Sequence, residues 1–107
     1  MFFTGSDVLG VAQYRAGDWK SAAANLERAL QTRWGRANGA GFFLAMARWQ
    51  LGEKDKARQM YREAVTWTDR YRPKDKELRR FRAEAAVLLA IKDDPKGKAN
   101  DKPAPKP

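Results

Sequence analysis

The sequence predicts an all-α protein, and three observations point to this class. Apolar residues recur at spacings of three and four over five stretches, which is the periodicity of amphipathic helices. Gly, Asp and Pro separate these stretches at positions where helices commonly begin or end. In addition, a helix-turn-helix pattern occurs twice, and its turn glycines, Gly17 and Gly52, lie 35 residues apart.

The first hairpin contains two predicted helices, 7–16 and 19–31. Asp7 suits the free N–H groups at the start of the first helix, and Gly17 ends it because glycine enters the left-handed conformation at little cost. Asp18 is the expected N-cap of the second helix. Its apolar face comprises Ala22, Ala23, Leu26, Ala29 and Leu30. Residues 34–39 contain two glycines and an asparagine, which predicts a loop.

A second hairpin and a fifth helix follow. Residues 40–51 and 54–70 are predicted helices joined at Gly52, and Pro73 breaks the chain before a helix over 74–91. One face of the fifth helix carries Leu78, Phe81, Ala85, Leu88 and Leu89. Asp93-Asp94-Pro95 is expected to stop this helix.

The two ends of the chain differ from the helical body. Phe2 and Phe3 either pack under the first helix or mark a repeat whose upstream neighbour once covered them. Residues 93–107 form a Lys/Pro-rich tail, which we expect to be disordered. The start MFFTGSD lacks the features of a secretory signal, and no stretch approaches the about 18 apolar residues of a membrane span. We therefore expect a cytoplasmic protein without membrane contact.

The register between the two hairpins is specific. At a shift of 35 residues, the positions that must be small for paired helices to approach closely are small in both copies: Gly10 and Ala45, Ala22 and Ala57, Ala29 and Ala64. A larger side chain fills the space between the helices in each copy, at Leu26 and Tyr61. A chance amphipathic hairpin would not reproduce this spacing twice.

In this register the chain resembles the tetratricopeptide repeat (TPR) family over about residues 8–65. The resemblance implies a TPR-like α-solenoid with two helix-turn-helix repeats, 1–35 and 36–72, then a C-terminal capping helix, 73–92, and the tail, 93–107. The chain departs from the family pattern where a tryptophan often opens the repeat, at Ser6 and Gly41. It departs again at the closing proline, which Trp34 and Asp69 replace.

A narrower resemblance is carried by three segments, LGVAQYRAGDW, FFLAMARWQLGEKDKAR and ELRRFRAEAAVLL. They are similar to the C-terminal TPR segment of large bacterial multidomain proteins, many of which carry a serine/threonine protein kinase domain or WD40-type repeats upstream. The signature residues of a kinase do not occur in this sequence, so kinase activity would belong to another part of such a protein.

The composition argues against catalysis. The sequence has neither Cys nor His, which removes the commonest general base, the commonest metal ligand and the thiol nucleophile. The glycines at 35 and 39 lack the spacing and the Lys-Ser/Thr of a phosphate-binding loop. Carboxylate pairs such as Asp69 and Asp75 are typical of solvated helix ends. We therefore expect a protein that is not an enzyme and has no cofactor or metal.

The TPR resemblance implies that the first helix of each repeat lines a concave groove. The groove residues would be Val11, Tyr14, Arg15, Phe42, Met46, Trp49 and Gln50. Because Phe42, Met46 and Trp49 are spaced at four and three, they share a helix face, which belongs either to the groove or to the core. An aromatic strip flanked by Arg15 and Arg48 would suit a protein or peptide partner of acidic character.

Two other functions stay open. The net charge of +9, with aromatic residues among the arginines of 70–74 and 79–82, would suit an accessory nucleic-acid-binding segment. Alternatively, the repeats are a structural cap of a longer solenoid. Two repeats and a cap are fewer than the about three repeats that usually make a stable array, which predicts self-association or further helices in a parent chain.

Overall fold

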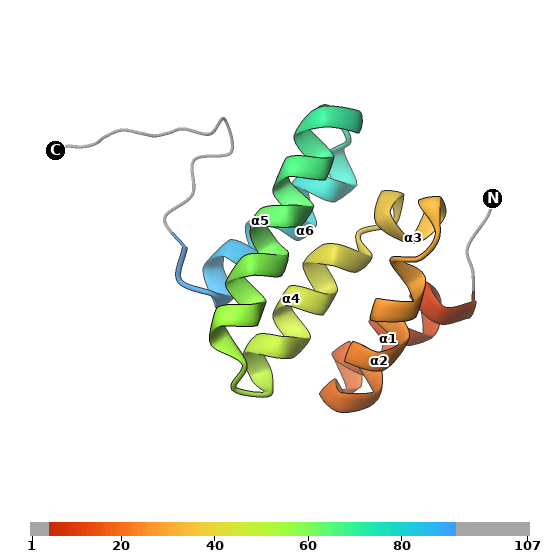
Figure 1. Ribbon diagram of the computed structural model, residues 1–107, viewed down its shortest axis with the longest axis vertical. Coiled ribbons are helices and arrows are strands. Elements are labelled where there is room, and N and C mark those ends of the chain that lie inside the picture. The colour runs from red at the N-terminus through yellow and green to blue at the C-terminus, as the bar shows by residue number, and fades with distance from the viewer. Residues whose placement is uncertain (1–4, 92–107) are drawn as a thin grey trace, which may run out of the picture.

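The computed structural model describes residues 5–91 and is all-α over that range, as the sequence predicts. Its six helices are α1 (Gly5–Ala16), α2 (Trp19–Ala29), α3 (Arg33–Ala37), α4 (Ala40–Gln50), α5 (Lys54–Tyr71) and α6 (Lys76–Leu88). Figure 1 shows the α1–α2 hairpin beside the α4–α5 hairpin, with α6 behind α5. Phe2, Phe3 and the tail 93–107 lie outside the described residues.

Helix α4 is the centre of the molecule, since it packs against α1, α2, α3, α5 and α6. Every residue from 40 to 47 is buried, and Phe42, Phe43, Leu44 and Met46 are among the largest fully buried side chains. Leu26 of α2, Met60 and Tyr61 of α5, and Leu78 of α6 add to this core, together with Leu89, the residue that follows α6. A helix that is apolar on all sides has to be surrounded, and α4 meets this requirement.

The turns after α1 and α4 have the same geometry, and they confirm the predicted role of the two glycines. Gly17 and Gly52 adopt φ values of 89° and 87°, the left-handed region that glycine enters without steric cost. The amide of Gly17 donates to Tyr14 at 3.0 Å, and that of Gly52 donates to Trp49 at 3.0 Å. Asp18 then caps α2 as predicted, because its Oδ1 accepts from the amide of Ser21 at 3.3 Å.

Small residues allow the helices to approach closely at two contacts. A Cβ atom on Gly10 would stand 2.7 Å from Cγ of Leu26, so α1 lies directly on the side chain that α2 places between the helices. Between α4 and α5, a Cβ on Gly41 would stand 2.9 Å from Cβ of Ala64. A larger side chain would clash at either contact, which explains why these positions require small residues.

The prediction of a loop over 34–39 is wrong. The structure has the short helix α3 there, and α2 ends at Ala29 rather than at Gln31. The hydroxyl of Thr32 caps α3, since it accepts from the amide of Gly35 at 2.9 Å and donates to the carbonyl of Ala29 at 2.8 Å. Gly35 is buried against that carbonyl, so this glycine serves close packing rather than a flexible turn.

The fifth predicted helix is shorter than expected. Pro73 does separate α5 from α6, but α6 starts at Lys76 because the Asp75 carboxylate caps it by accepting from the amide of Leu78 at 3.0 Å. At the other end the helix stops at Leu88, and Ala90 enters the left-handed region with φ of 56°. The end therefore comes before Asp93-Asp94-Pro95, a segment outside the described residues.

Among the helices of the described range, none combines the length and the apolar character needed to cross a bilayer. The charged residues are instead distributed along α5 and α6, where most of them are exposed.

Candidate functional site

Aromatic side chains from three helices meet where α1, α4 and α6 converge. The rings of Tyr14 and Phe43 have centroids 5.8 Å apart, and those of Phe43 and Phe81 are 4.8 Å apart, both in edge-to-face geometry. The guanidinium of Arg15 lies over the Phe43 ring, 5.1 Å from its centroid. We call these four residues the Arg15 cluster. It brings together side chains of α1, α4 and α6, which are distant in the sequence.

The Arg15 cluster already holds a carboxylate. Nη1 and Nη2 of Arg15 donate to the two oxygens of Glu84 in α6 at 2.5 and 3.0 Å. This fork-like geometry is the one in which arginine binds carboxylates most strongly. The side chains are 51% and 37% exposed, so water and other anions can reach the pair. Its two hydrogen bonds to Glu84 raise the pKa of Arg15, which keeps the guanidinium charged.

Tyr14 connects this cluster to the far end of α4. Burial raises the pKa of the Tyr14 phenol, and a hydrogen bond from Gln50 opposes that shift. Phe43 and Gln50 are seven residues apart, so both lie on the same face of α4. The hydroxyl of Tyr14 is therefore held between two helices instead of pointing freely into water.

The structure brings Tyr14, Arg15 and Gln50 together, while Val11 is partly buried against the core. It does not bring Phe42 and Met46 to that face. Both are fully buried, and Phe42 packs edge-to-face on Tyr61 of α5 at 6.0 Å. The assignment of these two residues to an open groove is thus corrected: they belong to the core.

Trp49 also lies away from the cluster. Its ring lies under two cations of α5, Lys54 at 4.7 Å and Arg58 at 5.0 Å. Phe42, Met46 and Trp49 were assigned to the wrong face because of the composition of α4. Its sequence FFLAMA is apolar on every side, so the spacing alone does not show which face of the helix points to the Arg15 cluster. Phe81 and Glu84 were not predicted for this site, and neither was Phe43, which lies under Arg15 in the core. The seven-residue spacing of Phe43 and Gln50 could have indicated the correct face of α4.

A second surface combines aromatic and basic side chains on α3 and α5. The rings of Trp67 and Tyr71 have centroids 5.4 Å apart, and the guanidinium of Arg70 lies 5.6 Å from the Tyr71 ring. Two hollows, of about 440 and 390 Å³, share Trp67 and Tyr71 in their walls. The arginines that line them are Arg36, Arg62, Arg70 and Arg72.

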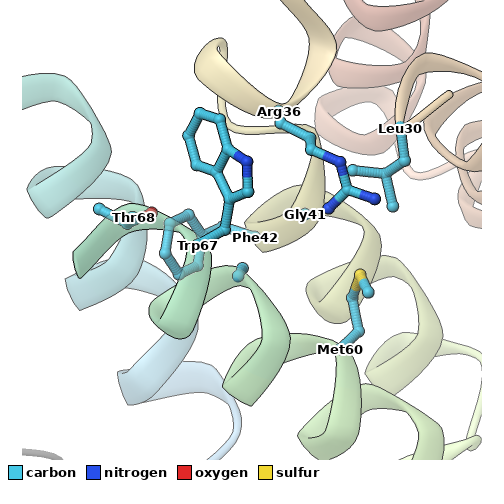
Figure 2. A pocket seen from close by; sticks show the side chains of 8 residues that line it. Leu30, Arg36, Gly41, Phe42, Met60, Trp67 and Thr68 are labelled. Carbon is cyan, nitrogen blue, oxygen red and sulfur yellow. The ribbon is translucent and has the colours of Figure 1, made fainter. Parts of the chain in front are cut away.

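Figure 2 shows how Arg36 of α3 and Trp67 of α5 face each other across the N-terminal end of α4. The cavity between them also involves Leu30, Gly41 and Met60, and its volume is about 10 Å³. That volume is of the order of one water molecule, so this inner cavity is too small for a ligand. Ligand binding on this side would use the outer hollows.

The two basic clusters noted in the sequence have different surroundings. Arg70, Tyr71 and Arg72 belong to the Trp67–Tyr71 surface. In the cluster 79–82, by contrast, Phe81 packs on Phe43 and Arg82 is buried. Within residues 5–91, no group of three or more Asp and Glu is arranged to hold a metal ion.

Comparison of this chain with protein-family models, with curated proteins and with solved structures gives no match. The TPR resemblance therefore rests on the residues quoted in the sequence.

Proposed function

We propose that the chain is a TPR-like, non-catalytic protein–protein interaction module that binds an acidic segment of a partner protein at the Arg15 cluster. Two features support the solenoid part of this proposal. The hairpins α1–α2 and α4–α5 turn through the same glycine geometry, and α2 of the first hairpin packs on α4 of the second. We further propose that the module acts within a larger bacterial, cytoplasmic protein or assembly, as the narrower resemblance implies.

The observation that carries the binding proposal is the Glu84 carboxylate on Arg15. A guanidinium that lies on an aromatic ring and is half-exposed is an established type of site for carboxylates. Exposed ion pairs contribute about 0–1 kcal/mol, so a partner's carboxylate can replace Glu84 at little cost. The half-buried rings of Tyr14 and Phe81 would offer apolar contact beside the displaced pair.

The test is the binding of a short fluorescent peptide rich in Glu and Leu, measured by anisotropy with the full chain. Arg15→Gln should weaken binding about tenfold, since it removes a charge-assisted hydrogen-bond pair. Glu84→Gln should strengthen binding because it removes the internal competitor. Arg80→Gln is the matched control, since its ion pair with Glu77 is exposed and lies outside the cluster.

Two results would contradict the proposal. One is equal binding by the Arg15→Gln variant and the Arg80→Gln control, which would indicate only general charge attraction. The other is an affinity that falls when Glu84 is neutralised, because Glu84 would then contribute to the site instead of competing for it.

The Trp67–Tyr71 surface favours single-stranded nucleic acid as a second candidate ligand. Bases stack on aromatic rings without regard to sequence, and the surrounding arginines suit phosphates. A labelled oligonucleotide should bind at low salt with a steep log–log dependence on salt. Tyr71→Ala should weaken it several-fold, because this ring is 59% exposed and is not needed for the core. Lys20→Gln on the exposed surface of α2 is the control, and an equal loss there would exclude a stacking site.

A further inference from the structure

Helix α6 ends in the same kind of turn as α1 and α4. The amide of Ala90 donates to Val87 at 3.2 Å and that of Ile91 donates to Ala86 at 2.9 Å. The first hairpin has the equivalent hydrogen bonds, since the amide of Gly17 donates to Tyr14 at 3.0 Å and that of Asp18 donates to Gln13 at 2.9 Å. Ala90 has φ of 56°, and it is the only non-glycine residue with positive φ among residues 5–91. Helix α6 therefore ends as the first helix of a hairpin does.

When the sequence is aligned on the turn residues Gly17, Gly52 and Ala90, RAEAAVLLA of α6 falls beside LGVAQYRAG of α1 and LAMARWQLG of α4. Ala83 then corresponds to Gly10 and Ala45, which are the small residues of the two complete hairpins. Val87 corresponds to Tyr14 and Trp49. This third register was not evident from the glycine spacing, because the turn residue of α6 is alanine.

The corresponding positions differ in what covers them. Gly10 lies against Leu26 of α2, Ala45 is fully buried, and Trp49 is covered by Lys54 and Arg58 of α5. In α6, Ala83 is exposed and Val87 is 83% exposed. The second helix thus covers Gly10 in the first hairpin and Trp49 in the second, whereas α6 leaves the corresponding Ala83 and Val87 open.

A groove of about 840 Å³ runs along this open face, between α5 and α6. Its apolar part is formed by Tyr61, Ala83, Ala86, Val87 and Ile91. Lys74 and Arg79 supply positive charge to its walls, while the charge of the buried Arg82 is compensated by its ion pair with Asp69. Glu84 and Arg15 are not part of its lining, so the groove is separate from the Arg15 cluster.

The adjoining segment of the chain is a poor occupant for this groove. Residues 92–107 read KDDPKGKANDKPAPKP, in which prolines disfavour a helix and alanine is the largest apolar side chain apart from proline. The segment is also basic, like the groove walls. A second copy is disfavoured for the same reason, because each chain carries a net charge of +9.

We propose that the α5–α6 groove binds an acidic amphipathic helix of a partner protein, which packs on Ala83 and Val87 as α2 packs on α1. The apolar side of the partner helix covers the open face, and its Glu and Asp residues meet the basic walls. The arrangement completes a third hairpin with a helix from outside residues 5–91. This binding mode does not depend on the peptide site proposed at the Arg15 cluster.

The probe is a synthetic helix derived from α5, the helix that covers the equivalent face of α4. It keeps the apolar side of α5, namely Ala57, Met60, Tyr61, Ala64 and Val65, and carries Glu in place of the exposed Lys and Arg residues. Fluorescence anisotropy with the full-length chain should show saturable binding. A peptide of the same composition in scrambled order should bind at least tenfold more weakly, because it lacks an apolar side.

The decisive variant is Val87→Glu. It places a carboxylate on the open face and should weaken probe binding at least tenfold, while circular dichroism stays unchanged because the native side chain is so exposed. Val8→Glu is the matched control, since Val8 is an exposed valine on α1, and it should bind like the unmodified chain. Val87→Glu should weaken probe binding at least tenfold in the Arg15→Gln background as well, which separates this groove from the Arg15 cluster.

Several outcomes would overturn the proposal. Absence of probe binding would exclude the helix site, and equal binding of the scrambled peptide would reduce it to charge attraction. Equal effects of Val87→Glu and Val8→Glu would place binding elsewhere. A dimer in sedimentation that Val87→Glu dissociates would identify the occupant as a second copy of the chain instead of an acidic partner.

Discussion

Arg82 of α6 is buried, and its Nη1 lies 3.1 Å from Oδ1 of Asp69 in α5, a side chain that is 52% exposed. The two residues are on consecutive helices that are separated by the break at Pro73. A guanidinium in this position is stable only if its charge is compensated, because burial of an isolated cation is costly. The pair therefore links α6 to the α4–α5 hairpin in addition to the apolar contacts of Leu78 and Leu89.

Replacing Asp69 with Asn should destabilise the chain by about 1–2 kcal/mol. Removing one partner of a fully buried pair costs about 3–5 kcal/mol, and the exposure of Asp69 reduces this figure. Urea unfolding followed by circular dichroism measures the change. Glu77→Gln is the control, since its pair with Arg80 is exposed on both sides and should contribute less than about 0.5 kcal/mol. Equal urea midpoints of unfolding for the two variants would show that the buried charge of Arg82 does not need Asp69 as its partner.

The sequence predicts the long helices well because glycine and apolar spacing are local properties. Gly17, Gly52 and Asp18 perform the roles expected of them, and the helix ends agree to within a few residues. The orientation of α4 is not a local property. An apolar residue such as Phe42 can face the core or a groove equally well, and only the positions of α1, α5 and α6 decide between the two.

The same limit applies to α3 and to the partners of the charged residues. Composition predicts a loop at Gly35 because glycine is usually a signal for a turn, whereas here it is required for packing. The pairing of Arg15 with Glu84 connects residues 69 positions apart, and periodicity carries no information about such a contact. Three of the predicted groove residues, Tyr14, Arg15 and Gln50, nevertheless come together in the structure.

Gly35→Ala should be strongly destabilising. A Cβ at this position would stand 2.0 Å from the carbonyl oxygen of Ala29, and a backbone atom cannot move aside as a side chain can. We expect a loss of at least about 2 kcal/mol, in the range of overpacked cores. Gly5→Ala is the control, because nothing lies within 4 Å of the added methyl group, and its effect should stay within about 0.5 kcal/mol. Thermal unfolding of both variants measures the difference. A tolerated Gly35→Ala would mean that α3 is not packed on α2 as described.

Ala90→Gly should stabilise the chain, although most glycine substitutions at alanine positions do the opposite. Ala90 has φ of 56°, where an L-residue other than glycine is strained by about 1 kcal/mol. Glycine relieves this strain but adds entropy to the unfolded chain, so we expect a net gain of a few tenths of a kcal/mol to about 1 kcal/mol. Urea unfolding of the full chain measures it. Ala83→Gly, within α6, is the comparison and should destabilise by about 1 kcal/mol. If both variants lose stability, the left-handed turn after α6 is not formed in solution.

Tyr14 should ionise at a higher pH than an ordinary tyrosine, and the stability of the chain should fall as it does so. Burial is the main cause that raises its pKa above the usual value of 10.0. In the alkaline range, therefore, the unfolded state loses the phenol proton before the folded state does, and stability decreases as the pH rises from the unfolded pKa through the folded one. The difference in tyrosinate absorbance between the unmodified chain and Tyr14→Phe gives the titration of this group alone. The loss of stability above about pH 10 should also be smaller in Tyr14→Phe, which has no phenol to ionise. A difference titration centred at or below the usual value would show that Tyr14 is not held between α1 and α4, and the Arg15 cluster would have to be redrawn without it.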